Sequence, residues 1–188
     1  VYAEAAALPG LRVVGIDVHI GSQLTDLDPF RQAYRKVAEL TAALRADGHR
    51  IERLDLGGGL GIPYERSNTA PPLPLEYGAM IHQELGALDC EIEIEPGRLI
   101  AGNSGILVTE VIYLKSGEGR DFLIVDAAMN DLIRPAMYGA YHDIVPLVEA
   151  APGAEQAPYD VVGPVCESGD TFAKQRNLPP LRAGDLVA

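Results

Sequence analysis

The sequence predicts an α/β fold followed by a mostly antiparallel β domain, and three observations carry this prediction. In the first half of the chain, β-rich apolar segments alternate with segments of helical periodicity. This is the pattern of a parallel sheet with right-handed crossovers. Glycine-containing turns follow the β-rich segments, and beyond about residue 102 helical periodicity becomes scarce while β-rich runs dominate. We therefore expect a domain boundary near residues 102–105.

Three segments of the first half are expected to form neighbouring parallel strands. Residues 12–20 are rich in β-branched side chains, residues 51–56 run from apolar side chains into glycines, and residues 91–95 alternate glutamate with isoleucine. Enrichment in β-branched residues and period-two alternation are typical of strands. The carboxyl ends of parallel strands meet at one edge of a sheet, where α/β folds place their sites.

Two helices are expected to connect these strands. For the first, Asp28 suits the N-cap, Pro29 the first helical position and Gly48 the C-terminal cap. Its predicted apolar face consists of Phe30, Ala33, Tyr34, Val37, Leu40, Thr41 and Leu44. A proline-rich loop over residues 62–74 leads to the second helix, over about 75–88. The side chains expected to point inward from it are Met80, Ile81, Leu85 and Leu88.

The second half is expected to consist of strands joined by loops. Residues 106–114, 122–125 and 159–165 are the β-rich runs, and residues 142–158 are predicted to form a loop or a hairpin. The first residue is valine, and the last residues enter a predicted strand. We therefore expect a fragment of a longer protein.

Composition excludes several classes of partner. The chain of 188 residues has 15 basic and 27 acidic side chains, a net charge of −12, which repels nucleic acid and anionic membranes. No apolar stretch reaches membrane-spanning length, and no basic and apolar leader opens the chain. The cysteines, Cys90 and Cys166, give neither a disulfide framework nor a metal-ligand spacing, so we expect no metal site and a cytoplasmic location.

Three polar groups end the predicted parallel strands. Gly57–Gly59 follow the second strand, and glycines let an anion approach backbone N–H groups closely, so this loop is a candidate phosphate cradle. A plain chain reversal is the alternative for this segment taken alone. His19 and Glu95 end the other two strands, and the same number of residues separates each of them from Gly57. This spacing brings the three groups to one edge and favours a site.

The residues around these strand ends have chemistry that suits a planar, phosphorylated ligand. His19 can stack on a ring or transfer a proton, although a bond to neighbouring backbone is the commoner role of a lone histidine. Glu95 either faces solvent, like the glutamates before it, or turns inward, where a carboxylate needs a partner such as a protonated heterocyclic nitrogen. Gly97 and Arg98 offer an N–H group and a guanidinium to a phosphate or a substrate carboxylate.

Five motifs, in this order, resemble the fold-type III pyridoxal phosphate-dependent decarboxylases. They are His19-Ile-Gly-Ser-Gln, Gly57-Gly-Gly-Leu-Gly, Glu95-Pro-Gly-Arg, Asn130-Asp-Leu-Ile-Arg-Pro-Ala-Met-Tyr-Gly-Ala-Tyr-His142 and Cys166-Glu-Ser-Gly-Asp170. The resemblance extends from Gly15 to the end of the chain. It implies the C-terminal half of a (β/α)8 TIM barrel over residues 1–103 and part of a mostly antiparallel β domain over residues 104–188.

The resemblance also implies pyridoxal 5′-phosphate as the cofactor. His19 would stack on the cofactor ring and take part in catalysis, and Glu95 would keep the ring nitrogen protonated, which makes the ring an electron sink. The other cofactor-binding residues implied by the resemblance are Ser22, Gly57, Gly58, Gly59, Pro96, Gly97 and Arg98.

The activity that the resemblance implies is the decarboxylation of meso-diaminopimelate to L-lysine, a carboxy-lyase reaction. Arg98, Arg134 and Tyr138 would bind the substrate, the two arginines by clamping its distal carboxylate. Cys166 would protonate the carbanion that is left when CO₂ departs, and Glu167 would bind the distal ammonium. Because both come from the partner subunit in this family, a homodimer is expected.

The lysine that links the cofactor in this family has no counterpart in the sequence. Lys36 lies in the first predicted helix, Lys115 and Lys174 lie in the β domain, and none has the strand-end position that the link requires. We therefore expect this chain alone to be inactive. Half a barrel is also expected to leave two strand edges and an apolar interior exposed.

Two alternatives remain open. A related decarboxylase of ornithine, arginine or carboxynorspermidine would share the cofactor site, although Arg134 and Glu167 together favour a substrate with both charges at its distal end. A non-catalytic module that binds a phosphate or the cofactor would account for the missing lysine.

Overall fold

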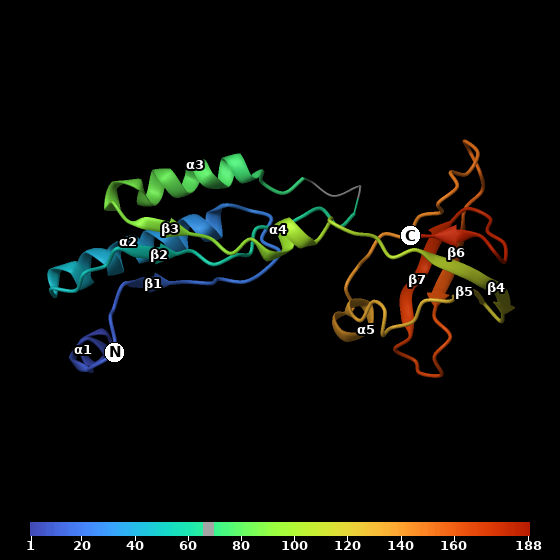
Figure 1. Ribbon diagram of the computed structural model, residues 1–188. Coiled ribbons are helices and arrows are strands. Elements are labelled where there is room, and N and C mark those ends of the chain that lie inside the picture. Colours follow the sequence, from blue (N-terminus) through green and yellow to red (C-terminus); the bar gives the residue numbers. More distant parts are fainter. Residues whose placement is uncertain (66–69) are drawn as a thin grey trace. The chain divides into compact units, whose positions relative to one another are not determined.

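The computed structural model describes residues 1–65 and 70–188, which form two compact units (Figure 1). The first unit comprises residues 1–63 and 70–104, and the second comprises residues 64–65 and 105–188. Residues 66–69, which belong to the loop predicted over 62–74, lie outside the described residues.

The first unit contains the parallel sheet that the alternating pattern predicts. Its strands, in the order β1-β2-β3, are β1 (Gly15–Asp17), β2 (Arg53–Asp55) and β3 (Glu91–Glu93). Each strand is shorter than the segment predicted for it, because the loop that follows begins one to three residues earlier than predicted, and β1 and β2 also start two or three residues later. The parallel pairing nevertheless continues into the loops, where the Leu56 N–H donates to the Glu93 carbonyl at 3.0 Å.

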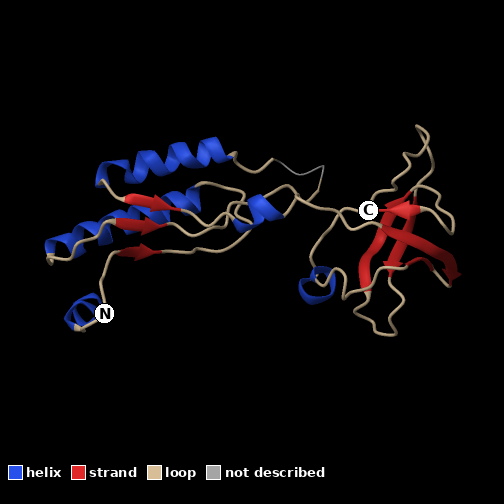
Figure 2. Ribbon diagram, viewed as in Figure 1, coloured by secondary structure: helices blue, strands red, loops and turns tan. Residues whose placement is uncertain are grey.

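Helices α2 (Asp28–Ala46) and α3 (Pro74–Leu85) connect the strands, as predicted (Figure 2). Leu27, not Asp28, is the N-cap of α2, and the Asp28 N–H donates to the Asp26 carboxylate at 2.9 Å. The predicted N-cap was therefore one residue too late, because the acidic side chain that satisfies the first turn lies two residues upstream. The remaining helical segments of this unit are α1 (Tyr2–Ala7), a 3₁₀ turn over Gly86–Leu88, and α4 (Gly97–Ala101).

The core of the first unit lies between the two long helices and one face of the sheet. Its buried side chains are Ile16, Phe30, Tyr34, Val37, Leu44, Ile51, Leu54, Leu56, Leu60, Tyr77, Met80, Ile81 and Leu85. The predicted apolar face of α2 is largely confirmed, but Leu40 is 42% exposed because it lies at the margin of that face. None of the helices in the described residues is long and apolar enough to cross a membrane.

The opposite face of the sheet is charged, so the expected apolar interior is wrong for these strands. Arg53 lies 3.0 Å from the Glu91 carboxylate and 3.1 Å from that of Glu93. Strand alternation puts Asp17 and Asp55 on the same face. The cause is local: each strand has one central apolar residue, and those of β1 and β2, Ile16 and Leu54, pack in the core with the helices, whereas Ile92 of β3 is 37% exposed.

The second unit contains a five-stranded sheet in the order β7-β6-β5-β4-β8. The strands are β4 (Thr109–Gly117), β5 (Arg120–Val125), β6 (Ala157–Val162), β7 (Thr171–Leu178) and β8 (Leu186–Val187). The β5–β6 pair is parallel and the other pairs are antiparallel. The core of this unit is made by Val111, Leu123, Val125, Tyr159, Val161, Leu178, Leu181 and Val187.

Two features of the second unit were not predicted. They are the helix α5 (Arg134–Tyr138) and the strand β7, whose sequence is largely polar. The segment before β6, predicted as loop or hairpin, is loop with one isolated bridge at Pro146.

The buried hydroxyl pair between α2 and α3 generates a stability prediction. The Tyr34 and Tyr77 hydroxyl oxygens lie 2.6 Å apart, and burial, followed by this hydrogen bond, raises the pKa of Tyr34. Changing either tyrosine to phenylalanine leaves the other hydroxyl buried without a partner, which costs about 1–3 kcal/mol of unfolding free energy. The double variant should lose less than the sum of the two single variants, as measured by urea unfolding of the full-length protein. Strictly additive losses would contradict the pairing.

Candidate functional site

The loops after β1, β2 and β3 remain in register beyond the strands. The Val18 N–H donates to the Asp55 carbonyl at 3.0 Å, and the Glu95 N–H donates to the Gly57 carbonyl at 2.8 Å. His19, the glycine run and Glu95 are thereby brought to the same edge of the sheet, as the equal spacing predicts.

Close approach of neighbouring backbone segments requires glycine at positions 57–59. A Cβ on Gly57 would lie 2.6 Å from the Val18 carbonyl oxygen, and a Cβ on Gly58 or Gly59 would overlap the carbonyl oxygen of Glu95 or Gly21 respectively. Gly57 and Gly59 also have φ angles of +63° and +109°, which side chains disfavour. Only residues without a Cβ let the three loops approach this closely.

Two N–H groups of the run already have acceptors within the chain. The Gly57 N–H donates to the Asp55 carboxylate at 2.9 Å, and the Gly58 N–H donates to His19 Nδ1 at 3.3 Å. These two glycines therefore shape the loop. The Gly59 N–H is the one that no acceptor in the described part of the chain engages. The Gly21 carbonyl, next to the exposed Ser22, lies where a Cβ of residue 59 would be.

The hydrogen bond from Gly58 also determines which tautomer the neutral His19 ring adopts. Because Nδ1 accepts a hydrogen bond, the proton of the neutral ring lies on Nε2. The side chain is exposed, so one face and Nε2 are accessible at the edge of the sheet.

Gln23 connects the three loops by hydrogen bonds, and no role was predicted for it. Its Nε2 donates to the Ile62 carbonyl at 2.6 Å, and its Oε1 accepts from the Ile62 N–H at 3.3 Å and from Arg98 Nη1 at 3.4 Å. Gln23 also has a φ angle of +61°. Its position at the end of the His19-Ile-Gly-Ser-Gln motif is the feature of the sequence that could have identified Gln23 as part of the site.

The glutamates of β3 and of the loop that follows it separate into two kinds. Arg53 pairs with Glu91 and Glu93, whereas among the described residues no side chain engages the Glu95 carboxylate, which is exposed. Gly97 begins α4 next to it, and a Cβ there would meet no atom within 4 Å. Neither packing nor a positive φ explains this glycine, so the space beside it is open to a ligand.

In the second unit, Asp170 organises the loop that carries Cys166 and Glu167. Its carboxylate is 3% exposed and accepts the Met129 N–H at 2.6 Å and the Val165 N–H at 2.7 Å. Cys166 is an exposed free thiol. The Glu167 carboxylate accepts from the Gly169 N–H and the Ser168 hydroxyl, so it is oriented by its own turn.

Arg134 and Tyr138 lie at the two ends of α5, also in the second unit. Tyr138 is 71% exposed and Arg134 is partly buried. Burial, followed by the positive charge of Arg134, lowers the pKa of His142. The predicted site residues thus form one group at the sheet edge of the first unit and another around α5 and the Asp170 loop.

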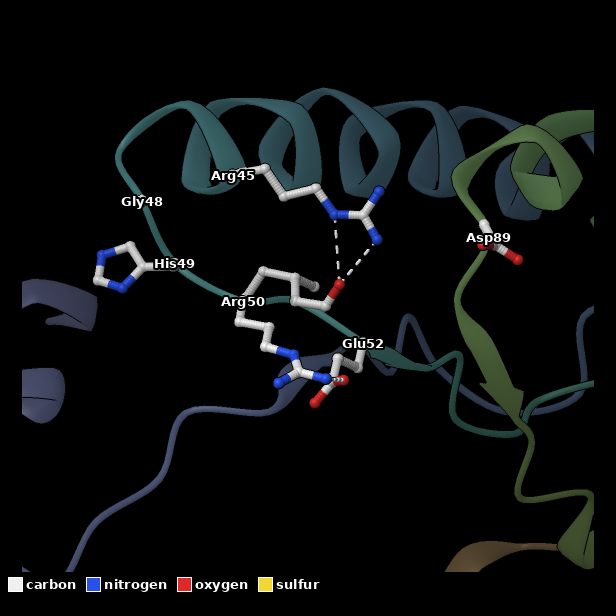
Figure 3. A pocket seen from close by; sticks show the side chains of 7 residues that line it. Arg45, Gly48, His49, Arg50, Glu52 and Asp89 are labelled. Carbon is white, nitrogen blue, oxygen red and sulfur yellow. Dashed lines mark hydrogen bonds and ion pairs between the residues drawn. The ribbon is translucent and has the colours of Figure 1, made fainter.

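A hollow at the amino ends of the parallel strands is not a second site. It is lined by Arg45, Gly48, His49, Arg50, Ile51, Glu52 and Asp89 (Figure 3). Arg45 donates to the Ile51 carbonyl, and Arg50 pairs with Glu52 at 2.6 Å. These arginines therefore hold the turn that precedes β2. Across the described residues, no group of three or more histidine, cysteine or acidic side chains could hold a metal ion.

The family and the relatives that this chain resembles are all decarboxylases. Residues 3–188 match the family described as pyridoxal-dependent decarboxylase, C-terminal sheet domain. The chain is 44% identical over 187 residues to a diaminopimelate decarboxylase of Zymomonas mobilis and 50% identical over 190 residues to one of Pseudomonas aeruginosa. Each alignment covers 100% of this chain and 44% of the relative.

A solved structure has the same fold. The diaminopimelate decarboxylase of Helicobacter pylori, complexed with L-lysine, aligns with a TM-score of 0.89 and 42% identity, over 99% of this chain and 45% of that chain. The chain therefore spans less than half the length of the relatives that it matches.

The glycine contacts predict different outcomes for two neighbouring substitutions. Gly58→Ala forces a Cβ against the Glu95 carbonyl and should lower the unfolding free energy of the full-length protein by about 1–3 kcal/mol. Gly97→Ala, which meets no atom within 4 Å, is the matched control and should change the unfolding free energy by less than about 0.5 kcal/mol. Urea unfolding compares the two variants, and equal losses would argue against the close approach at Gly58.

Proposed function

The chain belongs to the pyridoxal-dependent decarboxylases, and from this premise we propose that it is part of an enzyme that decarboxylates meso-diaminopimelate to L-lysine. The observation that carries the proposal is the convergence of His19, the glycine run and Glu95 at one edge of a parallel sheet. The identity of 44% and 50% with diaminopimelate decarboxylases supports this choice of substrate.

We propose further that residues 1–103 are half of a (β/α)8 barrel and residues 104–188 are part of a β domain. The β–α–β–α–β order, with both long helices packed on one face of the sheet, supports the barrel. The charged face around Arg53 would then line the inside of the barrel, beneath the site.

The residues at the sheet edge fit pyridoxal phosphate. The unengaged Glu95 carboxylate suits a protonated ring nitrogen, and the exposed imidazole of His19 suits the face of the ring. The Gly59 N–H, the Ser22 hydroxyl and the Arg98 guanidinium suit a phosphate, which the open space beside Gly97 and Pro96 would let approach the backbone. Gly57 and Gly58 would contribute by shaping this cradle.

Each residue would have a defined task in the reaction. When bound, pyridoxal phosphate supplies an electron sink for the bond that breaks as CO₂ leaves. Glu95 would hold a proton on the ring nitrogen, and His19 would keep the ring in place and exclude water from one face. The lysine that links the cofactor would lie outside this chain, since Lys36 lies in α2, Lys115 in β4 and Lys174 in β7.

The second unit would supply the substrate contacts. Arg134 and Tyr138, together with Arg98, would bind the distal carboxylate. Cys166 would deliver the proton that replaces CO₂ at Cα, and Glu167 would bind the distal ammonium. Under this proposal Cys166 and Glu167 act in the site of a second copy, so the active enzyme is a homodimer.

An assay of CO₂ release tests the proposal. The full-length enzyme, loaded with pyridoxal phosphate, should release CO₂ from meso-diaminopimelate at least about 100-fold more efficiently than from L-ornithine, L-arginine or carboxynorspermidine, because Arg134 has no carboxylate to bind in a distal diamine. Faster release from one of the other substrates would favour a related decarboxylase. A protein that binds the cofactor but releases no CO₂ would be a non-catalytic module.

Glu95 and Glu91 differ in their partners, and this difference predicts their kinetic effects. Glu95→Gln removes the charge proposed to hold the ring proton and should lower kcat on the order of 100-fold, as the loss of one preorganised charge does. Glu91→Gln removes a charge paired with Arg53 on the same strand face and should leave kcat within about twofold. Both variants are expected to retain the absorbance of the bound cofactor. Equal effects on kcat would contradict the role of Glu95.

A further inference from the structure

The short helix α5 needs support from its surroundings. It has only five residues, Arg134–Tyr138, too few for a helix to be stable by itself. It ends at Gly139, which has a φ angle of +59°, and the chain then continues through Tyr141, His142 and Asp143. The orientation of Arg134 and Tyr138 therefore depends on what holds this following segment.

Arg176 of β7 holds that segment at several points. Its Nη1 donates to the Tyr141 hydroxyl at 2.9 Å and lies 3.4 Å from the Asp143 carboxylate, and its Nη2 donates to the His142 carbonyl at 3.0 Å. Its guanidinium also lies over the Tyr141 ring, 4.2 Å from the centroid. The side chain is 15% exposed, and α5 packs against β7 (Figure 1). A planar guanidinium suits such divergent acceptors, and an ammonium does not.

A bulge in β7 aims Arg176 at this segment. Tyr159 pairs with Arg176 and Val161 pairs with Ala173, so two residues of β7 lie opposite Asp160. One of them, Gln175, has a φ angle of +50° and donates its N–H to the buried Asp160 carboxylate at 2.8 Å. An extra residue reverses the faces of the side chains that follow it. The bulge thus sets the face of β7 from which Arg176 projects.

We propose that Arg176 is a positioning residue for substrate binding. By clamping Tyr141–Asp143, it fixes α5 and so orients Arg134 toward the distal carboxylate of the substrate. This inference rests on the proposed function, in which Arg134 binds that carboxylate. Arg176 itself touches neither substrate nor cofactor.

Steady-state kinetics of the full-length enzyme test the proposal. Arg176→Gln should raise KM for meso-diaminopimelate about tenfold and leave kcat within about twofold, because binding is lost without any loss specific to the transition state. Inhibition by L-lysine, which keeps the distal carboxylate because the carboxylate lost is the one at the reacting carbon, should weaken about tenfold as well. Inhibition by cadaverine, which lacks the distal carboxylate, should change less than about twofold. Arg182→Gln is the matched control, since Arg182 is an exposed arginine in the turn before β8, and it should change neither constant.

A double-mutant cycle separates positioning from a general structural role. If Arg176 acts through Arg134, the Arg134→Gln/Arg176→Gln double variant should have the same KM as Arg134→Gln alone. Arg176→Lys should restore little of the affinity, and Tyr141→Phe, which keeps the ring but loses the hydroxyl, should raise KM about threefold. These milder variants keep the test decisive if Arg176→Gln fails to fold.

Hydrogen exchange provides a readout that does not require activity. Amides of residues 134–143 should exchange at least about tenfold faster in Arg176→Gln than in wild type or Arg182→Gln, while the amides of β5 and β6 keep their protection. Unchanged exchange over 134–143 would overturn the clamp. Additive effects in the cycle, or equal losses of affinity for cadaverine and diaminopimelate, would overturn its action through Arg134. Wild-type enzyme that does not decarboxylate diaminopimelate would overturn the proposed function and, with it, the orientation of Arg134 toward substrate.

Discussion

Backbone-to-backbone contact at the carboxyl edge of the parallel sheet is the constraint on which the candidate site depends. Gly58 packs against the Glu95 carbonyl and Gly59 against that of Gly21, at separations that no Cβ could occupy. Because these contacts join the loops of three successive strands, they determine where His19, Ser22 and Glu95 lie relative to one another. The glycine run therefore acts first as a spacer between loops, and only its Gly59 end offers an N–H group to a ligand.

Carboxylates that accept backbone N–H groups, the exposed Asp126 and the buried Asp160 and Asp170, give the second unit its loop geometry. Asp126 accepts the Thr109 hydroxyl and the Glu110 N–H, which lower its pKa, the hydroxyl contributing most. Asp160 and Asp170 each accept backbone N–H groups, in the β7 bulge and in the Cys166 loop respectively. The acidic excess of the chain thus includes carboxylates that replace missing strand hydrogen bonds.

Prediction from sequence succeeded where an element is long enough to show its period. The long helices have that length, and the three-residue parallel strands were recognised from the longer β-rich or alternating segments that contain them. By contrast, α4 and α5 have five residues each and β7 is polar and bulged, so none of them produces a recognisable pattern. His19 and Glu95 were identified as candidate site residues because each follows a predicted strand. The difference between Glu95 and the preceding glutamates was hidden, because it depends on Arg53, which reaches them from a neighbouring strand. Gln23 and Arg176 were hidden for the same reason, since their roles arise from partners remote in sequence.

Backbone strain connects these two hidden residues. In the described residues, a positive φ outside glycine occurs at Gln23, Asp89 and Gln175. A left-handed conformation costs such residues about 1–2 kcal/mol, so it persists only where surrounding contacts enforce it. Gln23 contacts Arg98, and Gln175 directly precedes Arg176, which supports the segment that follows Arg134. In both cases the strained backbone sets the direction of a side chain that supports an arginine proposed to bind an anion. The side chain of Gln23 supports Arg98, and that of Arg176 supports Arg134. The strain at these two positions therefore follows from the precision that two guanidinium groups need, whereas Asp89, in the turn before β3, belongs to a residue type that tolerates this conformation.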